Sequence, residues 1–71
     1  MSPETLRQKR RQLGLSLAAL SAKAPASRWR LIEFELGNIE LRPEEVLRIE
    51  AALRKYSREK IAALSGLAEA I

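Results

Sequence analysis

Apolar residues recur at helical spacing along this chain, in short segments separated by helix-breaking residues. The first segment begins at Ser2-Pro3, an N-cap residue followed by proline at the first helical position. It ends at Gly14, because glycine tolerates the positive φ that is common just after a helix. These signals predict a first helix over roughly residues 3–13.

Residues 16–37 predict two further helices joined by a short turn. Ser16 and Ser27 suit the two N-caps, and Pro25 ends the earlier helix because proline disfavours helical geometry in the residue before it. The later helix covers residues 27–36 and has two inward side chains, Leu31 and Phe34. We therefore expect a helix-turn-helix in this segment.

Pro43 opens a fourth predicted helix, and Ser57 caps a fifth over about residues 57–70. The apolar residues of both keep a 3-4-3 spacing: Val46, Ile49, Leu53 and Tyr56 in the fourth, and Ile61, Leu64, Ala68 and Ile71 in the fifth. Ala and Leu dominate the apolar set, which favours helix over strand. The sequence thus predicts an all-α bundle of five helices in a single domain, residues 1–71.

The composition excludes several classes of function. The chain has no Cys, His or Asp, so the usual metal ligands, thiol nucleophiles and imidazole bases are missing. We expect no enzyme activity, no metal and no cofactor. No apolar run approaches a membrane span and the N-terminus lacks a signal-peptide core, which predicts a cytoplasmic protein. A chain this short also leaves little room for a small-molecule pocket.

Charge is unevenly distributed along the chain. Residues 1–30 hold seven Lys/Arg against one Glu, whereas residues 31–71 hold six against eight acidic residues. One basic end on a helical domain is typical of nucleic-acid binders, which gain affinity by releasing phosphate counterions. The alternative is a basic surface that only keeps the protein soluble.

The chain resembles the Cro/repressor-type helix-turn-helix family, also called XRE-like, which is common among phage and bacterial regulators. The likeness covers residues 6–53 and is carried by Lys9-Arg10, Gln12-Leu13-Gly14-Leu15, Leu20, Lys23, Ser27, Leu31, Glu35, Gly37 and Ala52-Leu53. It implies a lambda-repressor-like bundle that inserts helix 27–36 into the major groove of double-stranded DNA. The implied function is sequence-specific transcriptional regulation, as a nucleoid-associated repressor.

Family positions that read bases fall on Arg28, Trp29 and Glu33. Arg28 can donate two hydrogen bonds to guanine, and Glu33 can accept one from cytosine. Trp29 would press on a thymine methyl group, unless it packs against the preceding helix instead. The resemblance also places a structural salt bridge between Arg10 and Glu35, which would otherwise be two solvated side chains.

The expected phosphate contacts are residues that position the protein without reading sequence. They are Lys9, Arg10, Arg11, Ser27 and Arg30.

Several positions depart from the family pattern. Pro25 stands where glycine usually makes the turn, so we expect the turn to be built differently, one residue longer. Leu17, Ile32 and Leu36 are apolar where polar residues are usual, and exposed apolar patches mark protein contacts. The alternative function is therefore a protein-interaction module, an antirepressor or antiactivator, that uses this surface. Slight rotation of the helices would instead bury these side chains.

A chain of 71 residues buries a modest core, so we expect self-association as a homodimer. The candidate interface is the stripe of Ile61, Leu64, Ala68 and Ile71. The same stripe can equally cover the domain's own core against Val46 and Leu53.

Overall fold

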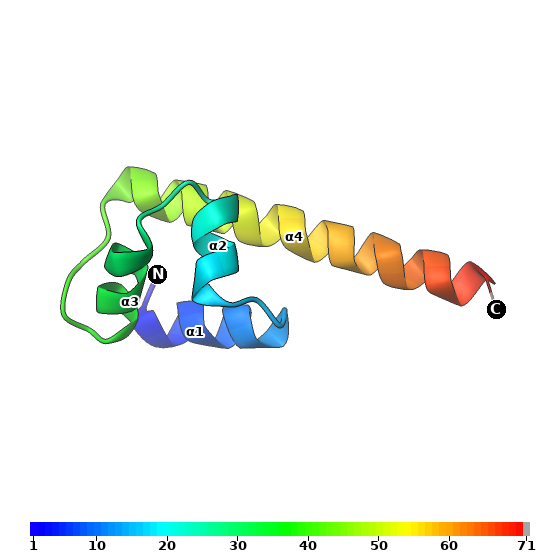
Figure 1. Ribbon diagram of the computed structural model, residues 1–71, viewed down its shortest axis with the longest axis horizontal. Coiled ribbons are helices and arrows are strands. Elements are labelled where there is room, and N and C mark those ends of the chain that lie inside the picture. Colours follow the sequence, from blue (N-terminus) through cyan, green and yellow to red (C-terminus); the bar gives the residue numbers. More distant parts are fainter. Residues whose placement is uncertain (71) are drawn as a thin grey trace.

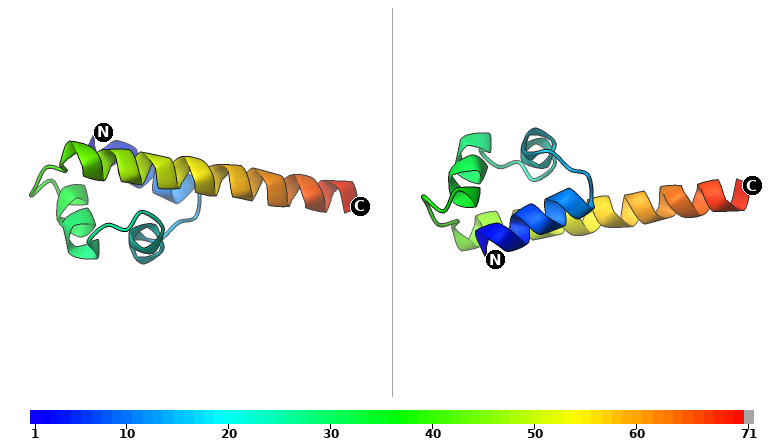
Figure 2. Two further views of the ribbon diagram at one scale, coloured as in Figure 1. Left: turned by 90° about the horizontal axis from the view of Figure 1, so that it is seen from above. Right: turned by 90° about the horizontal axis from the view of Figure 1, so that it is seen from below.

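The computed structural model describes the backbone of residues 1–70 and the side chains of residues 1–67. This part of the chain is all-α, and its four helices are α1 (Pro3–Gln12), α2 (Leu17–Lys23), α3 (Arg28–Glu35) and α4 (Pro43–Ala70) (Figure 1). α3 packs against α1 and α2, and α2 packs against α4. α1 and α4 lie apart, with α2 and α3 connecting them (Figure 1) and lying on one side of both (Figure 2). α4 continues well beyond the other three helices.

Serine caps the N-terminus of each of the first three helices, as the sequence predicts. The hydroxyls of Ser2, Ser16 and Ser27 accept hydrogen bonds from the backbone N–H three residues on. Each bond satisfies one of the N–H groups that a helix start leaves without an internal partner.

Glycine ends α1 and α3 at the predicted positions. Gly14 has φ of 64° and Gly37 has φ of 82°, both in the left-handed region. Beyond Gly37, the Asn38 N–H reaches back to the Glu33 carbonyl, and the Gly37 N–H bonds to Phe34. This pattern is a Schellman motif, and α1 ends in the same way.

The connection from α2 to α3 is not longer than usual, contrary to expectation. It spans only residues 24–27, and α2 ends with the Ala26 N–H bonded to the Ser21 carbonyl. That bond belongs to a Schellman motif too, which places Pro25 at the position that requires positive φ. Pro25 has φ of 21°, far from the value near −65° that its ring prefers. The turn keeps its length, and proline carries the strain.

The prediction of five helices is wrong, because residues 43–70 form the single helix α4. Ser57 lies inside it, among Arg, Lys and Glu residues that favour helix, with no glycine or proline nearby to end a turn. A serine alone does not start a helix when the residues before it continue one. No helix in the described chain, α4 included, combines the length and apolar character that crossing a membrane requires.

The core lies where the four helices meet. Each helix contributes one fully buried large side chain, and these are Leu6, Leu20, Leu31 and Ile49. Phe34 and Leu53 are also buried beside them. The inward positions predicted for α3 are therefore confirmed. In the first half of α4, Ile49 and Leu53 are buried, whereas Val46 and Tyr56 are only partly buried.

The stripe predicted for the last helix does not cover this core. Ile61 and Leu64 are 61% and 58% exposed, on the part of α4 that extends past the other helices. The side chain of Ala68 and all of Ile71 lie outside the described residues.

Candidate nucleic-acid interface

α3 is fixed to α1 by a buried ion pair between Arg10 and Glu35. The Arg10 Nε and Nη2 atoms donate to the two carboxylate oxygens of Glu35, both at 2.9 Å. Arg10 Nη1 also donates to the Leu15 carbonyl at 3.0 Å. Arg7 donates to the Glu35 backbone carbonyl at 2.8 Å. The predicted salt bridge is present, and it holds the C-terminal end of α3 in place.

A second ion pair fixes the first turn of α3 to the start of α4. Arg30 Nε and Nη2 donate to the carboxylate of Glu45, both at 2.8 Å. Glu45 is buried, and its carboxylate also accepts from the Arg42 backbone N–H at 2.9 Å. The hydrogen bonds from Arg30 and Arg42 lower the pKa of Glu45 to about 2.

These two ion pairs correct the list of phosphate contacts. Arg10 and Arg30 were both predicted to bind phosphates, but each guanidinium is engaged with a buried carboxylate. The hydrogen bond to its glutamate raises the pKa of each arginine. We therefore assign both residues to supporting α3.

Lys9 is exposed and lines a groove between α1 and α4. Arg11 is exposed at the end of α1, and Ser27 serves as the N-cap of α3. Of the predicted phosphate contacts, Lys9, Arg11 and Ser27 remain predictions.

The outer face of α3 carries the predicted base-reading residues. Arg28 is exposed in its first turn, and Trp29 is 61% exposed. Packing of Trp29 against α2, the alternative considered from sequence, is thus not what the structure shows. Trp29 and Leu36 are seven residues apart, so they lie on the same side of the helix.

Glu33 is half-buried and already has a partner. Its Oε2 accepts a hydrogen bond of 2.8 Å from the side-chain amide of Asn38, just after the helix. A cytosine amine would have to share this carboxylate or replace Asn38. The hydrogen bond between Asn38 and Glu33 was not predicted from the sequence, because it depends on the Schellman turn that folds the chain back after α3.

The apolar departures from the family pattern divide into two groups. Leu17 packs against the core and Ile32 is half-buried. Leu36 remains 63% exposed, so together with Trp29 it forms the apolar part of this surface.

Sequence reasoning did not identify the Arg30–Glu45 pair, although part of its signal was present. Pro43 at the first helical position followed by Glu45 resembles a capping box, in which a glutamate reaches back to the chain before the helix. The capping signal does not predict that Arg30, fifteen residues earlier in the chain, reaches the same carboxylate.

Comparisons of the chain with known protein families, with curated proteins and with solved structures gave no match.

Proposed function

We propose that this protein is a sequence-specific DNA-binding transcriptional regulator, a repressor, that places α3 in the major groove. The observation that carries the proposal is the exposure of Arg28 and Trp29 in the first turn of a helix that is buried on its other side. In helix-turn-helix proteins, the N-terminal residues of the second helix contact base edges.

The two ion pairs support this function by making α3 rigid. Arg10–Glu35 holds the C-terminal end of the helix to α1, and Arg30–Glu45 holds its first turn to α4. Base recognition by bidentate hydrogen bonds depends on a fixed donor position, so a rigid reading helix improves discrimination.

Arg28 is the residue we assign to guanine recognition. Its guanidinium can donate to O6 and N7 of one base, which discriminates by about 1–3 kcal/mol. Trp29 beside it can contact a thymine methyl group or a sugar. The test is binding to the sequence that the protein selects from random duplexes, and to unrelated duplexes, by wild type, Arg28→Ala and Arg48→Ala.

Arg48 is an exposed arginine on α4 and serves as the matched control. Arg28→Ala should weaken binding to the selected sequence and leave unrelated duplexes nearly unaffected, because base contacts carry specificity. Equal losses from both variants would show that Arg28 contributes only charge.

The dimer is part of the same proposal. Ile61 and Leu64 lie exposed on the extension of α4, where an isolated helix gains no stability from packing. Pairing of two copies there would bury them and present two α3 helices to a two-fold operator. Analytical ultracentrifugation of wild type and of the double variant Ile61→Asn/Leu64→Asn tests the dimer. We expect a dimeric wild type and a monomeric variant, and a monomeric wild type would contradict the proposal.

A second candidate function is favoured by the apolar character of the same surface. Trp29 and Leu36 are both more than 60% exposed on one side of α3, and large exposed apolar groups mark protein contacts. In that case α3 binds a protein, as an antirepressor or antiactivator does. Leu36→Asn discriminates the two, because it should weaken protein binding but preserve or improve DNA binding.

A further inference from the structure

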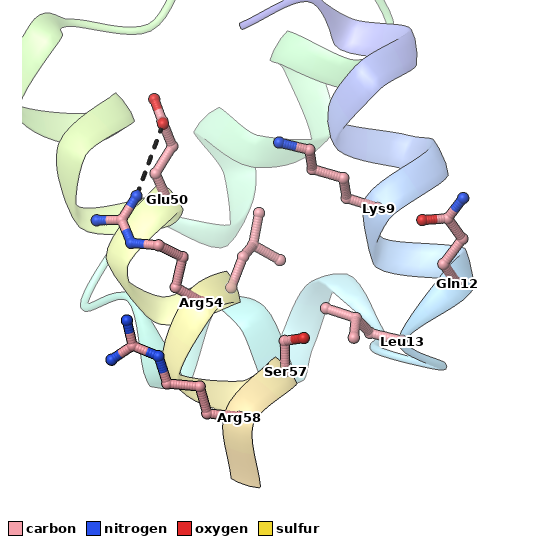
Figure 3. A pocket seen from close by; sticks show the side chains of 8 residues that line it. Lys9, Gln12, Leu13, Glu50, Arg54, Ser57 and Arg58 are labelled. Atoms are coloured by element: carbon pink, nitrogen blue, oxygen red, sulfur yellow. Dashed lines mark ion pairs between the residues drawn. The ribbon is translucent and has the colours of Figure 1, made fainter. Parts of the chain in front are cut away.

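A groove of about 360 Å³ lies between α1 and α4. α2 and α3 lie on one side of these two helices (Figure 2). Lys9 and Leu13 line it from α1, and Leu53, Arg54 and Arg58 line it from α4 (Figure 3). Lys60 donates a hydrogen bond of 2.8 Å to the Leu13 carbonyl, which ties the end of α1 to α4. This bond links the two sides of the groove near its end at Leu13.

Positive charge dominates the rim of this groove. The groove is lined by three cationic side chains, Lys9, Arg54 and Arg58, and by a single carboxylate, that of Glu50. Arg54 and Glu50 are 4.0 Å apart with both side chains well exposed, a loose contact compared with the pairs at Glu35 and Glu45. Among the described side chains, Lys9 and Arg58 form no salt bridge. The rim thus has cationic groups available for a ligand.

The floor of the groove is apolar. Leu53 is 6% exposed and belongs to the core, and Leu13 packs against that core from the end of α1. A ligand that only carries negative charge would leave this floor without a partner, whereas an apolar side chain between carboxylates would match both floor and rim.

We propose that the groove between α1 and α4 binds an acidic segment of a partner protein. One apolar side chain of that segment lies on Leu13 and Leu53, and its flanking carboxylates pair with Lys9, Arg54 and Arg58. The groove is partly open to solvent, which suits a peptide segment better than an enclosed small molecule. It also faces away from α3, so the partner can bind while α3 holds DNA. The proposal does not require that DNA is bound.

A panel of short fluorescein-labelled peptides tests the proposal, with pairs of glutamates flanking one leucine, isoleucine or phenylalanine. Fluorescence anisotropy is measured with wild type and with Arg54→Glu/Arg58→Glu. The control is Arg48→Glu/Lys55→Glu, which makes the same charge change at exposed α4 positions outside the groove. Circular dichroism melts show that each variant is folded.

We expect peptides of this panel to bind wild type and to bind the groove variant at least about tenfold more weakly, with little change in the control. Replacing the central apolar residue by glycine should also weaken binding. No binding by any peptide of the panel, or equal losses in both variants, overturns the proposal. The proposal is also overturned if the groove variant alone binds a labelled DNA duplex more weakly than wild type does, because the groove would then be a nucleic-acid surface. DNA binding by wild type is measured separately, so this test can fail while the proposed function stands.

Discussion

Arg10 and Glu35 are joined by two parallel hydrogen bonds of 2.9 Å across the contact between α1 and α3. Their side chains are only 16% and 5% exposed. Removing one member would leave the other charge nearly buried and without its partner, which costs about 3–5 kcal/mol. We therefore expect Glu35→Ala to lower the free energy of unfolding by about that amount in urea denaturation.

Glu50→Ala provides the matched control, because Glu50 has only the loose, exposed contact with Arg54. This variant should change stability by less than about 1 kcal/mol. Similar losses of unfolding free energy in the two variants would mean that the Arg10–Glu35 pair stabilises the fold no more than an exposed ion pair does.

The ion pair of Glu45 makes stability depend on pH in a defined window. The folded protein holds the pKa of Glu45 at about 2, below its ordinary value of 4.5. The carboxylate therefore contributes its full stabilisation above pH 4.5, and this is lost as pH falls through about 2. The stability difference between wild type and Glu45→Gln should be constant at higher pH and shrink across that window. Glu44→Gln removes a charge at the exposed neighbouring residue and leaves the Arg30–Glu45 pair in place, so it serves as the control. A flat difference for Glu45→Gln would contradict the assignment.

Proline at residue 58 distinguishes one long helix from two. Proline is favoured at the first position of a helix, so Arg58→Pro would be tolerated if Ser57 were an N-cap. In the continuous α4 it removes a hydrogen bond and clashes with the preceding turn, at a cost of about 3 kcal/mol or more. Thermal unfolding of Arg58→Pro beside Arg58→Ala measures this. A proline variant as stable as the alanine variant would restore the two-helix interpretation.

Pro25 sits where the α2 Schellman motif requires positive φ, with φ of 21°. Glycine adopts this conformation without strain and restores the N–H that proline lacks. Pro25→Gly should therefore raise the free energy of unfolding by about 1–3 kcal/mol. Pro3→Gly should lower it, because Pro3 occupies the first position of α1, where proline fits. Destabilisation by both substitutions would show that Pro25 is relaxed in the native turn.

The sequence predicts the first three helices well because their boundaries depend on local chemistry. Ser2, Ser16 and Ser27 cap helices, and Gly14 and Gly37 end them, through contacts within a few residues. Ser57 is also a serine that could cap a helix, yet the residues before and after it continue α4 through this position. Local capping signals therefore identify a helix start only where the preceding residues cannot continue a helix.

The roles of the charged residues in the candidate site are harder to predict, because tertiary contacts decide which of them are paired with a carboxylate. Arg28 and Arg30 look equivalent in the sequence, but only Arg30 meets Glu45, fifteen residues later. Lys9 and Arg10 are adjacent, yet one faces the groove and the other is paired with Glu35. A basic segment indicates that cations are available but does not say which of them are already paired.

The fluorescence of Trp29, the single tryptophan, gives the most direct test of the central claim that α3 binds DNA. The protein is titrated with mixed-sequence duplex DNA at several salt concentrations while its emission is recorded. DNA binding through α3 predicts a saturable change in emission and an affinity that falls steeply as salt rises. Unchanged emission, together with no anisotropy increase of labelled duplex at low salt, would contradict the claim and favour a protein partner for α3.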